Sequence, residues 1–251
     1  MNMIRCMKGI VVAGVMAGAS MAQAGFFADF ESYSSGQRLQ GVDGWKGWDN
    51  ASSVAGLVSS SFAYESNRSL AVTGIEQSST DAVHEFSGAT SGVWTVSAMQ
   101  YLASGQTGST YFILMNTYRD HGNNNGGFWS TQLRFDLGAG KVFDDFRGGA
   151  VALLMNTWSE IRVDIDLTAD TVKSYYNDQL ISSGTWTRGG SSAKSLAAID
   201  LYTGDRNVAY YDDIGVTSMA DMNVARVPSQ GPIATMALGG LCLLPRRRRV
   251  K

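Results

Sequence analysis

Alternation of apolar and polar residues with a period of two is the feature that most constrains the fold of this chain. In the segment WSEIRVDIDL, Ile161, Val163 and Ile165 alternate with Arg162 and Asp164. Successive side chains of a β-strand point to opposite faces, so the segment predicts a strand with one apolar and one polar face.

Segments of this kind recur and are separated by short turns such as HGNNNGG, TGDRN and RGGSS. YYNDQLIS predicts a hairpin with a tight turn at Asn177 and Asp178. No window predicts a helix longer than two turns. Many short strands with one apolar face each predict an all-β domain, a two-sheet antiparallel sandwich. The predicted strands cover residues 69–73, 82–86, 93–102, 111–118, 129–137, 158–167, 172–176, 197–202 and 208–216.

The N-terminus is typical of a signal peptide. Arg5 and Lys8 precede an apolar stretch, residues 9–22, which is too short to cross a bilayer as a helix. Small residues follow in the order expected of a cleavage site, at Ala22, Ala24 and Gly25. We expect residues 1–24 to form a signal helix that is removed, and the protein to be exported.

The C-terminus has three parts: a proline motif with Pro228 and Pro232, an apolar helix at residues 233–244, and a basic cluster of Arg246, Arg247, Arg248 and Arg249. This order resembles the PEP-CTERM type of sorting signal, here with Pro-Ser-Gln-Gly-Pro in place of Pro-Glu-Pro. The resemblance implies that residues 227–251 insert transiently into an inner membrane. A sorting protease then processes the tail, and the protein reaches the cell envelope or the outside. Residues 220–226 are expected to link it to the sandwich at 25–219.

Composition narrows the range of partners. The only cysteines, Cys6 and Cys242, lie in the two terminal segments, so the body holds no disulfide. Without the signal peptide and the basic end, 13 basic residues face 22 acidic ones, a net charge of −9. This charge argues against nucleic acid and anionic membranes as partners of the body, and it is compatible with neutral polymers or divalent cations. The body has no phosphate-binding glycine loop, so the sequence does not indicate an organic cofactor.

Three segments resemble concanavalin A-like, laminin-G-type jelly rolls: DFESYSSGQRLQGVDGWKGWDN, TWSEIRVDIDLTADTVKSYYND and VAYYDDIGV. The resemblance spans residues 27–216. It implies two curved sheets, a concave face that often holds sugar, and a first strand next to the last one. A fold alone does not define a function.

Candidate sugar-binding residues combine an aromatic side chain on a polar strand face with a polar loop. Trp158 falls on the polar phase of its strand, whereas Trp129 is assigned to the core by phase. The other candidates lie in and before the glycine-rich loop: Tyr118, Arg119, Asn123 and Asn124.

An enzymatic alternative rests on Glu160, Asp164 and Asp166, which share one face of one strand. Residues two apart on such a face lie about 7 Å from each other, within the range of about 5–9.5 Å that paired-carboxylate glycoside hydrolysis uses. Arg162 among them would lower their pKa values, which opposes a general acid. The favoured interpretation is a solvated polar face with an ion pair.

A structural calcium is the predicted cofactor. By phase Asp212 lies with Ile214 on the core side, and a buried carboxylate needs a partner or a cation. The neighbouring first strand would bring Glu31 to Asp212 or Asp213, and hard oxygen ligands suit calcium. The equally weighted alternative is that Asp212 caps backbone N–H groups.

The sequence therefore favours a non-catalytic exported protein that binds extracellular polysaccharide. Two other hypotheses remain open. The first is a polysaccharide-degrading hydrolase or lyase on the same fold. The second is a structural matrix protein without a ligand.

Overall fold

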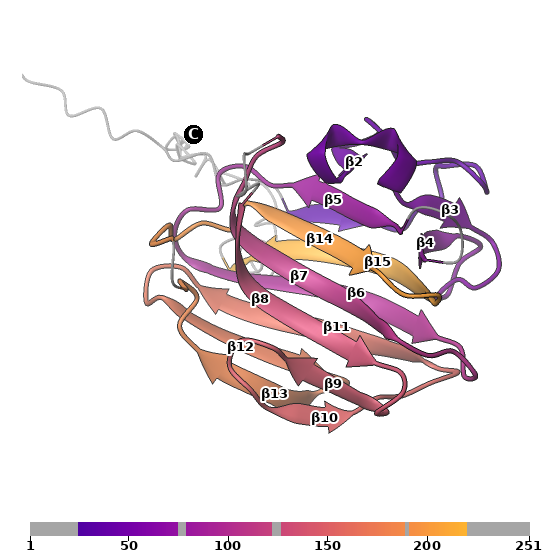
Figure 1. Cartoon of the computed structure of the whole chain (residues 1–251). Helices are drawn as coiled ribbons and strands as arrows, with labels where there is room; N and C mark the ends of the chain where they lie inside the picture. The colour runs from indigo at the N-terminus through magenta and orange to yellow at the C-terminus, as the bar shows by residue number, and fades with distance from the viewer. Residues whose placement is uncertain (1–24, 75–78, 122–126, 189–190, 220–251) are drawn as a thin grey trace, which may run out of the picture.

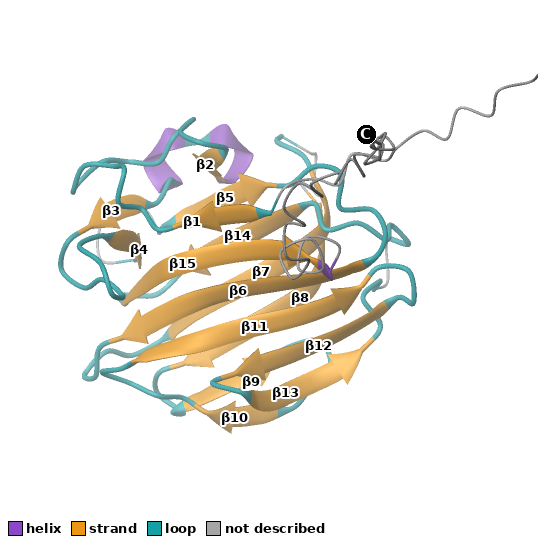
Figure 2. Cartoon of the chain, turned by 180° about the vertical axis from the view of Figure 1, so that it is seen from behind, coloured by secondary structure: helices purple, strands orange, loops and turns teal. Residues whose placement is uncertain are grey.

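The computed structural model describes residues 25–74, 79–121, 127–188 and 191–219. These residues form two antiparallel β-sheets packed face to face, which confirms the predicted jelly-roll sandwich (Figures 1 and 2). Apart from Met219, which has helical backbone at the end of the described chain, helix among the described residues is limited to two short 3-10 turns, η1 (Trp48–Asn50) and η2 (Ser52–Val54). None of the described helices is long and apolar enough to cross a membrane.

Each sheet contains strands from distant parts of the sequence. Sheet A has the order β13 (Gln179–Gly184), β12 (Thr171–Tyr176), β11 (Trp158–Asp166), β6 (Val93–Leu102), β15 (Val208–Ser218), β4 (Ser69–Thr73) and β3 (Leu57–Ser59). Sheet B has the order β10 (Ala150–Ala152), β9 (Lys141–Asp144), β8 (Gly127–Asp136), β7 (Ser109–Tyr118), β14 (Ala198–Thr203), β5 (Asp81–Glu85) and β2 (Trp45–Gly47).

Strand β1 (Phe26–Ala28) lies outside this order and pairs with β15. Phe26 lies opposite Val216, and Ala28 lies opposite Ile214. The first and last strands of the described chain are therefore neighbours, as the jelly-roll resemblance implies.

The inner faces of the two sheets form one apolar core. Ile161, Val163 and Ile165 of β11 have no exposed surface, which confirms the period-two prediction for this strand. Large aromatic side chains from distant parts of the sequence, including Trp45 and Trp186, are buried with them. Each fully buried large apolar side chain contributes about 1.5–3 kcal/mol, so the core stabilises a body that has no cysteine.

The predicted hairpin turn is confirmed between β12 and β13. Tyr176 pairs with Gln179, which leaves Asn177 and Asp178 as the two turn residues. Their φ angles are 46° and 61°, the left-handed values that a type I′ turn requires and that Asn and Asp tolerate.

Strand β8 corrects one prediction. Phase assigned Trp129 to the core, but its side chain is 40% exposed. A register shift inserts Ser130 between the pairs Thr131–Leu114 and Trp129–Met115. An extra residue reverses the faces of every residue beyond it, so Trp129 lies on the outer face of sheet B.

A second register shift lies in β15 between Asp212 and Gly215. Tyr211, rather than Asp212, is therefore the residue that joins Ile214 and Val216 in the core. Asp212 is fully buried as predicted, but its contacts lie with the loop that precedes β4.

Candidate functional site

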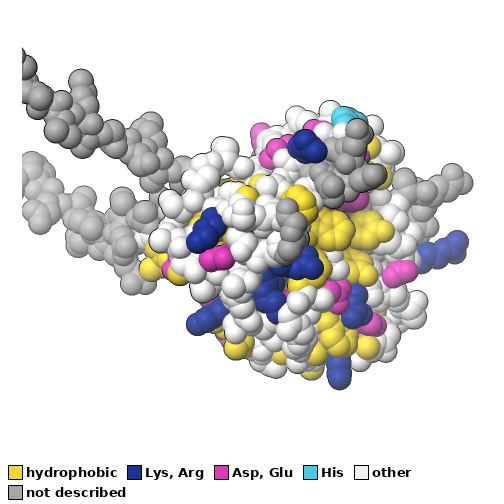
Figure 3. All heavy atoms as spheres, turned by 60° about the vertical axis from the view of Figure 1, so that its left-hand side comes forward, with side chains coloured by type: hydrophobic (Ala, Val, Ile, Leu, Met, Phe, Trp, Pro, Cys, Tyr) yellow, Lys and Arg dark blue, Asp and Glu magenta, His cyan; other side chains and the backbone are white. Residues whose placement is uncertain are grey.

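The outer face of sheet B carries a second apolar cluster, separate from the core. Four buried side chains from β5, β7 and β14 form it: Val83, Ile113, Met115 and Ala198. Trp48, Tyr111 and Tyr118 pack against this cluster. Apolar side chains are also visible between acidic and basic ones on the surface in Figure 3. An outer sheet face covered in this way can support a binding site.

A pocket of about 380 Å³ opens on this face. Four strands and the turn η1 contribute its lining: Trp48, Asp81, Tyr111, Ile113, Trp129, Gln132, Asp200 and Tyr202. Four of these side chains are aromatic, two are acidic and none is basic. This combination of rings and hydrogen-bond acceptors suits a polar ligand with flat apolar faces.

The aromatic side chains come from neighbouring strands. Tyr111 of β7 lies opposite Tyr202 of β14, and their rings stack with centroids 5.7 Å apart. Trp129 belongs to β8, which pairs with the other edge of β7, and lies opposite Met115. Trp48 packs against Tyr118 edge to face, with centroids 5.2 Å apart. The pocket is therefore bordered by rings on several sides.

Asp81 and Asp200 lie together in the lining, and Asp200 is only 2% exposed. Asp200 lies opposite Val83, two residues along β5 from Asp81, so the two carboxyls are diagonal neighbours on one face. Their side chains hydrogen-bond to each other. Each also has a buried Oδ1 atom without a hydrogen-bond partner in the described chain. Two buried carboxyls in contact are stable only when they share a proton or meet a cation.

The pKa values of both acids support a shared proton. Burial, followed by the charge of Asp81 and its hydrogen bond, raises the pKa of Asp200 well above the ordinary 3.8. Burial also raises the pKa of Asp81, although the hydrogen bond with Asp200 partly opposes this. Two carboxylates in contact cannot both ionise easily, so the pair titrates as a unit.

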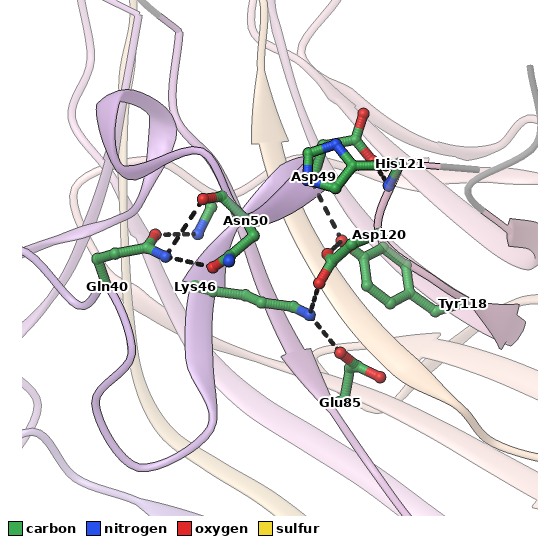
Figure 4. A network of polar contacts seen from close by, with 9 residues as sticks. Gln40, Lys46, Asp49, Asn50, Glu85, Tyr118, Asp120 and His121 are labelled. Atoms are coloured by element: carbon green, nitrogen blue, oxygen red, sulfur yellow. Dashed lines mark hydrogen bonds and ion pairs between the residues drawn. The ribbon is translucent and has the colours of Figure 1, made fainter. Parts of the chain in front are cut away.

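A polar network at the rim holds η1 against the end of β7 (Figure 4). Lys46 Nζ forms ion pairs with Glu85 and, at 2.6 Å, with Asp120. The Tyr118 hydroxyl donates to Asp120 at 2.9 Å and accepts from the Asp49 backbone N–H. Burial alone would lower the pKa of Lys46, but the bonds to Asp120 and Glu85 raise it above its ordinary value.

A second basic residue on this face is also paired. Arg134 of β8 forms ion pairs with Asp136 at 2.8 Å and with Asp145 at 3.0 Å. Gln132 donates its amide N–H to the same Asp145 carboxylate at 2.8 Å. Arg134 and Lys46 are thus each neutralised by two acids, and neither lines the pocket.

The structure separates the predicted sugar-binding residues. Tyr118 lies beside the pocket of sheet B, and Arg119 is exposed next to it. Asn123 and Asn124 lie outside the described residues. Trp158 lies on the opposite sheet, in an outer aromatic cluster with Tyr64, Tyr101, Phe62 and Tyr210.

The three acids of the enzymatic alternative lie on the outer face of sheet A, away from the pocket. Asp164 accepts a hydrogen bond from Thr95 and lies 3.7 Å from Arg162. Asp166 accepts from the backbone of the following turn, and Glu160 lies on the same strand face. The surroundings of these acids are a polar strand face with ion pairs.

Two of the three predicted calcium ligands, Asp212 and Glu31, are bonded to protein N–H groups. Asp212 accepts from the Tyr64 backbone and from Asp213, and Glu31 accepts from the backbone of residues 67 and 68. Burial raises the pKa of Asp212 to about 6. Within the described residues, no group of three or more His, Cys, Asp or Glu is placed to hold a metal. The calcium site stays a prediction.

Most of the two terminal motifs lies outside the residues that the structure describes. Gly25 begins the described chain, whereas the rest of the cleavage motif, the linker and the whole sorting tail, residues 220–251, lie outside the described residues. Their roles stay predictions from the sequence.

Sequence reasoning missed most of the pocket. In the segment AIDLYT, Asp200 and Tyr202 alternate with Ile199 and Leu201, so the period-two signal marks both as outward-facing residues. Asp81 stands just before the predicted strand at 82–86. No sequence signal pairs it with Asp200, because strand order is set by contacts between distant segments.

Neither a family model nor a curated protein matches this sequence. The structure is similar to the globular domain of T. cruzi calreticulin, with a TM-score of 0.53 and 9% identity over 80% of this chain and 90% of that one. It is also similar to a sialidase, with a TM-score of 0.52 and 10% identity over 78% of this chain but only 18% of that one. An endo-β-1,4-glucuronan lyase from Trichoderma reesei gives a TM-score of 0.49 and 12% identity over 77% of this chain and 94% of that one. At such identities the likeness shows the fold alone.

Proposed function

We propose that the protein is an exported β-sandwich that binds a polysaccharide in the pocket on the outer face of sheet B without cleaving it. The pocket lining carries this proposal. Sugar rings have apolar faces that stack on aromatic side chains and hydroxyl groups that donate to carboxylates. The four rings and the Asp81–Asp200 pair supply both kinds of contact.

The arrangement of acids disfavours hydrolysis in this pocket. Glycosidases that use two carboxyls hold them about 5–9.5 Å apart, so that the sugar or a water molecule fits between them. Asp81 and Asp200 instead bond to each other. A lyase acting on a uronic acid needs positive charge or donors beside the substrate carboxylate. The described lining has no basic residue, and its strand side chains supply neutral donors only, such as the hydroxyls of Tyr111 and Tyr202.

The localisation part of the proposal rests on the two ends of the sequence. A removable signal peptide and a transiently membrane-inserted tail would deliver the sandwich to the envelope or the outside, where polysaccharides are present. Mass spectrometry of the protein recovered from cells and medium tests this. The proposal requires a chain that starts at Gly25 and lacks the basic C-terminal end.

The binding test measures two quantities on one polysaccharide panel: retention of the protein in affinity electrophoresis and release of new chain ends. Retention without new ends is expected. New ends would support the hydrolase or lyase hypothesis, and absence of both signals would support the structural one.

Matched tryptophan variants locate the site. Trp129→Ala removes an outer ring of sheet B, and Trp158→Ala removes one of sheet A. Retention should fall for Trp129→Ala and persist for Trp158→Ala. The opposite result would move the site to sheet A, as the sequence alone suggested.

A further inference from the structure

We infer that the pocket on sheet B selects neutral sugar units and rejects uronic acids, and that Asp81 and Asp200 set this selectivity. The inference rests on the proposed polysaccharide binding and specifies its ligand class. It concerns a single difference between otherwise identical sugars, the replacement of the C6 hydroxymethyl group by a carboxylate.

The charge of the pocket depends on the protonation of Asp81 and Asp200. Asp200 is 2% exposed, and its carboxyl hydrogen-bonds to that of Asp81. A shared proton between them leaves one net negative charge on the pair. The carboxyl edges that line the pocket then act as acceptors for sugar hydroxyl donors.

The described lining of the pocket also lacks a counter-charge. Lys46 is bound by Glu85 and Asp120, and Arg134 is bound by two further acids. Arg188 lies at the edge of β8, where it donates to the Trp129 carbonyl oxygen. Its guanidinium group covers the Phe146 ring. None of these three cations is among the residues that line the pocket.

A neutral sugar and a uronate interact differently with this acidic lining. A neutral sugar offers hydroxyl hydrogens to the acid pair and its ring faces to Tyr111, Tyr202 or Trp129. A uronate in the same position places a second negative charge beside a buried one, with no basic side chain in the lining to offset it. Such an unfavourable contact is an efficient source of specificity, because it acts against one ligand only.

The test uses soluble β-1,4-glucan, β-1,4-mannan and α-glucan, each paired with the same polymer oxidised at C6 to the uronate. Binding of the purified protein is measured by calorimetry at neutral pH and low salt. The neutral member of a retained pair should bind at least about tenfold more tightly than its oxidised partner.

The double variant Asp81→Asn/Asp200→Asn keeps the shape of the pair and removes its charge. It should weaken binding of the neutral polymer and reduce the preference for it by about tenfold or more. Asp178→Asn, at the exposed hairpin turn of sheet A, is the matched control and should bind like the wild type. If the double variant does not fold, as judged by circular dichroism, the single variant Asp81→Asn, at the less buried member of the pair, takes its place.

The possible failures are distinguishable. Equal binding of both members of a pair, or tighter binding of the uronate, would overturn the inference and leave polysaccharide binding intact. An unchanged preference in a folded double variant would remove Asp81 and Asp200 as its cause. If no polymer bound at all, the proposed function itself would fail, and the inference with it.

Discussion

As the pH rises above about 4, the Asp200→Asn variant is predicted to gain free energy of unfolding relative to the wild type. The pKa of Asp200 is raised in the folded protein, mainly by burial. The native state therefore keeps a proton that the unfolded chain releases above the ordinary pKa of 3.8. The stability that this proton contributes is fully present below the ordinary carboxyl pKa of the unfolded chain. It decreases as the pH rises above that pKa and is lost once the pH has passed the raised pKa of the folded state.

The size of the effect follows from one proton. Where the native pair holds one proton more than the unfolded chain, stability falls by about 1.4 kcal/mol per pH unit. An asparagine has no such proton, so the variant should gain stability relative to the wild type with this slope over the pH range in which the folded pair keeps its proton. Of the other groups that face the pair, Tyr111 and Tyr202 have raised pKa values and stay neutral over this range. Asp49 adds a negative charge.

The quantity to measure is the difference in the free energy of unfolding between variant and wild type, because His84 and Asp200 change this free energy with pH in opposite directions. Burial lowers the pKa of His84 to about 4 from the ordinary 6.5. The unfolded chain then binds more protons than the native state in this interval, so His84 makes stability rise with pH. The two contributions partly cancel in the wild type, whereas subtraction removes the histidine contribution.

Urea denaturation followed by tryptophan fluorescence at pH 5, 6 and 7 gives the required free energies of unfolding. Asp178→Asn serves as the control for loss of one acidic charge, since this residue lies in the exposed turn of sheet A. Parallel pH profiles for Asp200→Asn and wild type would refute the shared-proton interpretation of the pair.

Three further outcomes are expected. Trp129→Ala should reduce polysaccharide affinity about tenfold or more with little change in melting temperature, because its ring is 40% exposed. Lys46→Met should lower the free energy of unfolding by about 1 kcal/mol, because Glu85 and Asp120 lose their shared cation; denaturation in low salt measures this. Calcium should raise the melting temperature of the wild type but not of Asp212→Asn, because a cation stabilises a buried carboxylate whose pKa burial raises to about 6.

Each of these outcomes has a contrary result. Normal affinity of Trp129→Ala, with loss in Trp158→Ala, would assign the site to sheet A. Unchanged stability of Lys46→Met at low and high salt would mean that its ion pairs contribute nothing measurable. A calorimetric melting temperature that is the same with calcium and with chelator would reject the metal site and leave Asp212 as a cap for backbone N–H groups.

The sequence by itself determined the longer strands of the fold, whereas the short strands β1, β2, β3, β9 and β10 were not predicted. In β11 and β6 every second residue is buried, and most of these residues are apolar, because one face of each strand must meet the core; this local period is visible without the structure. The turn at Asn177 and Asp178 was equally predictable, since few residues tolerate left-handed backbone angles. The candidate residues on the polar phase, such as Trp158, followed from the same local rule.

Only the tertiary structure decided which outward-facing residues form a site. A single extra residue, Ser130, reverses the face on which Trp129 lies, and a period-two pattern cannot show such an insertion. Asp81 and Asp200 meet because β5 and β14 are neighbours in sheet B. That neighbourhood results from core packing between segments far apart in the chain, whereas the sequence pattern records only whether each residue faces inward or outward.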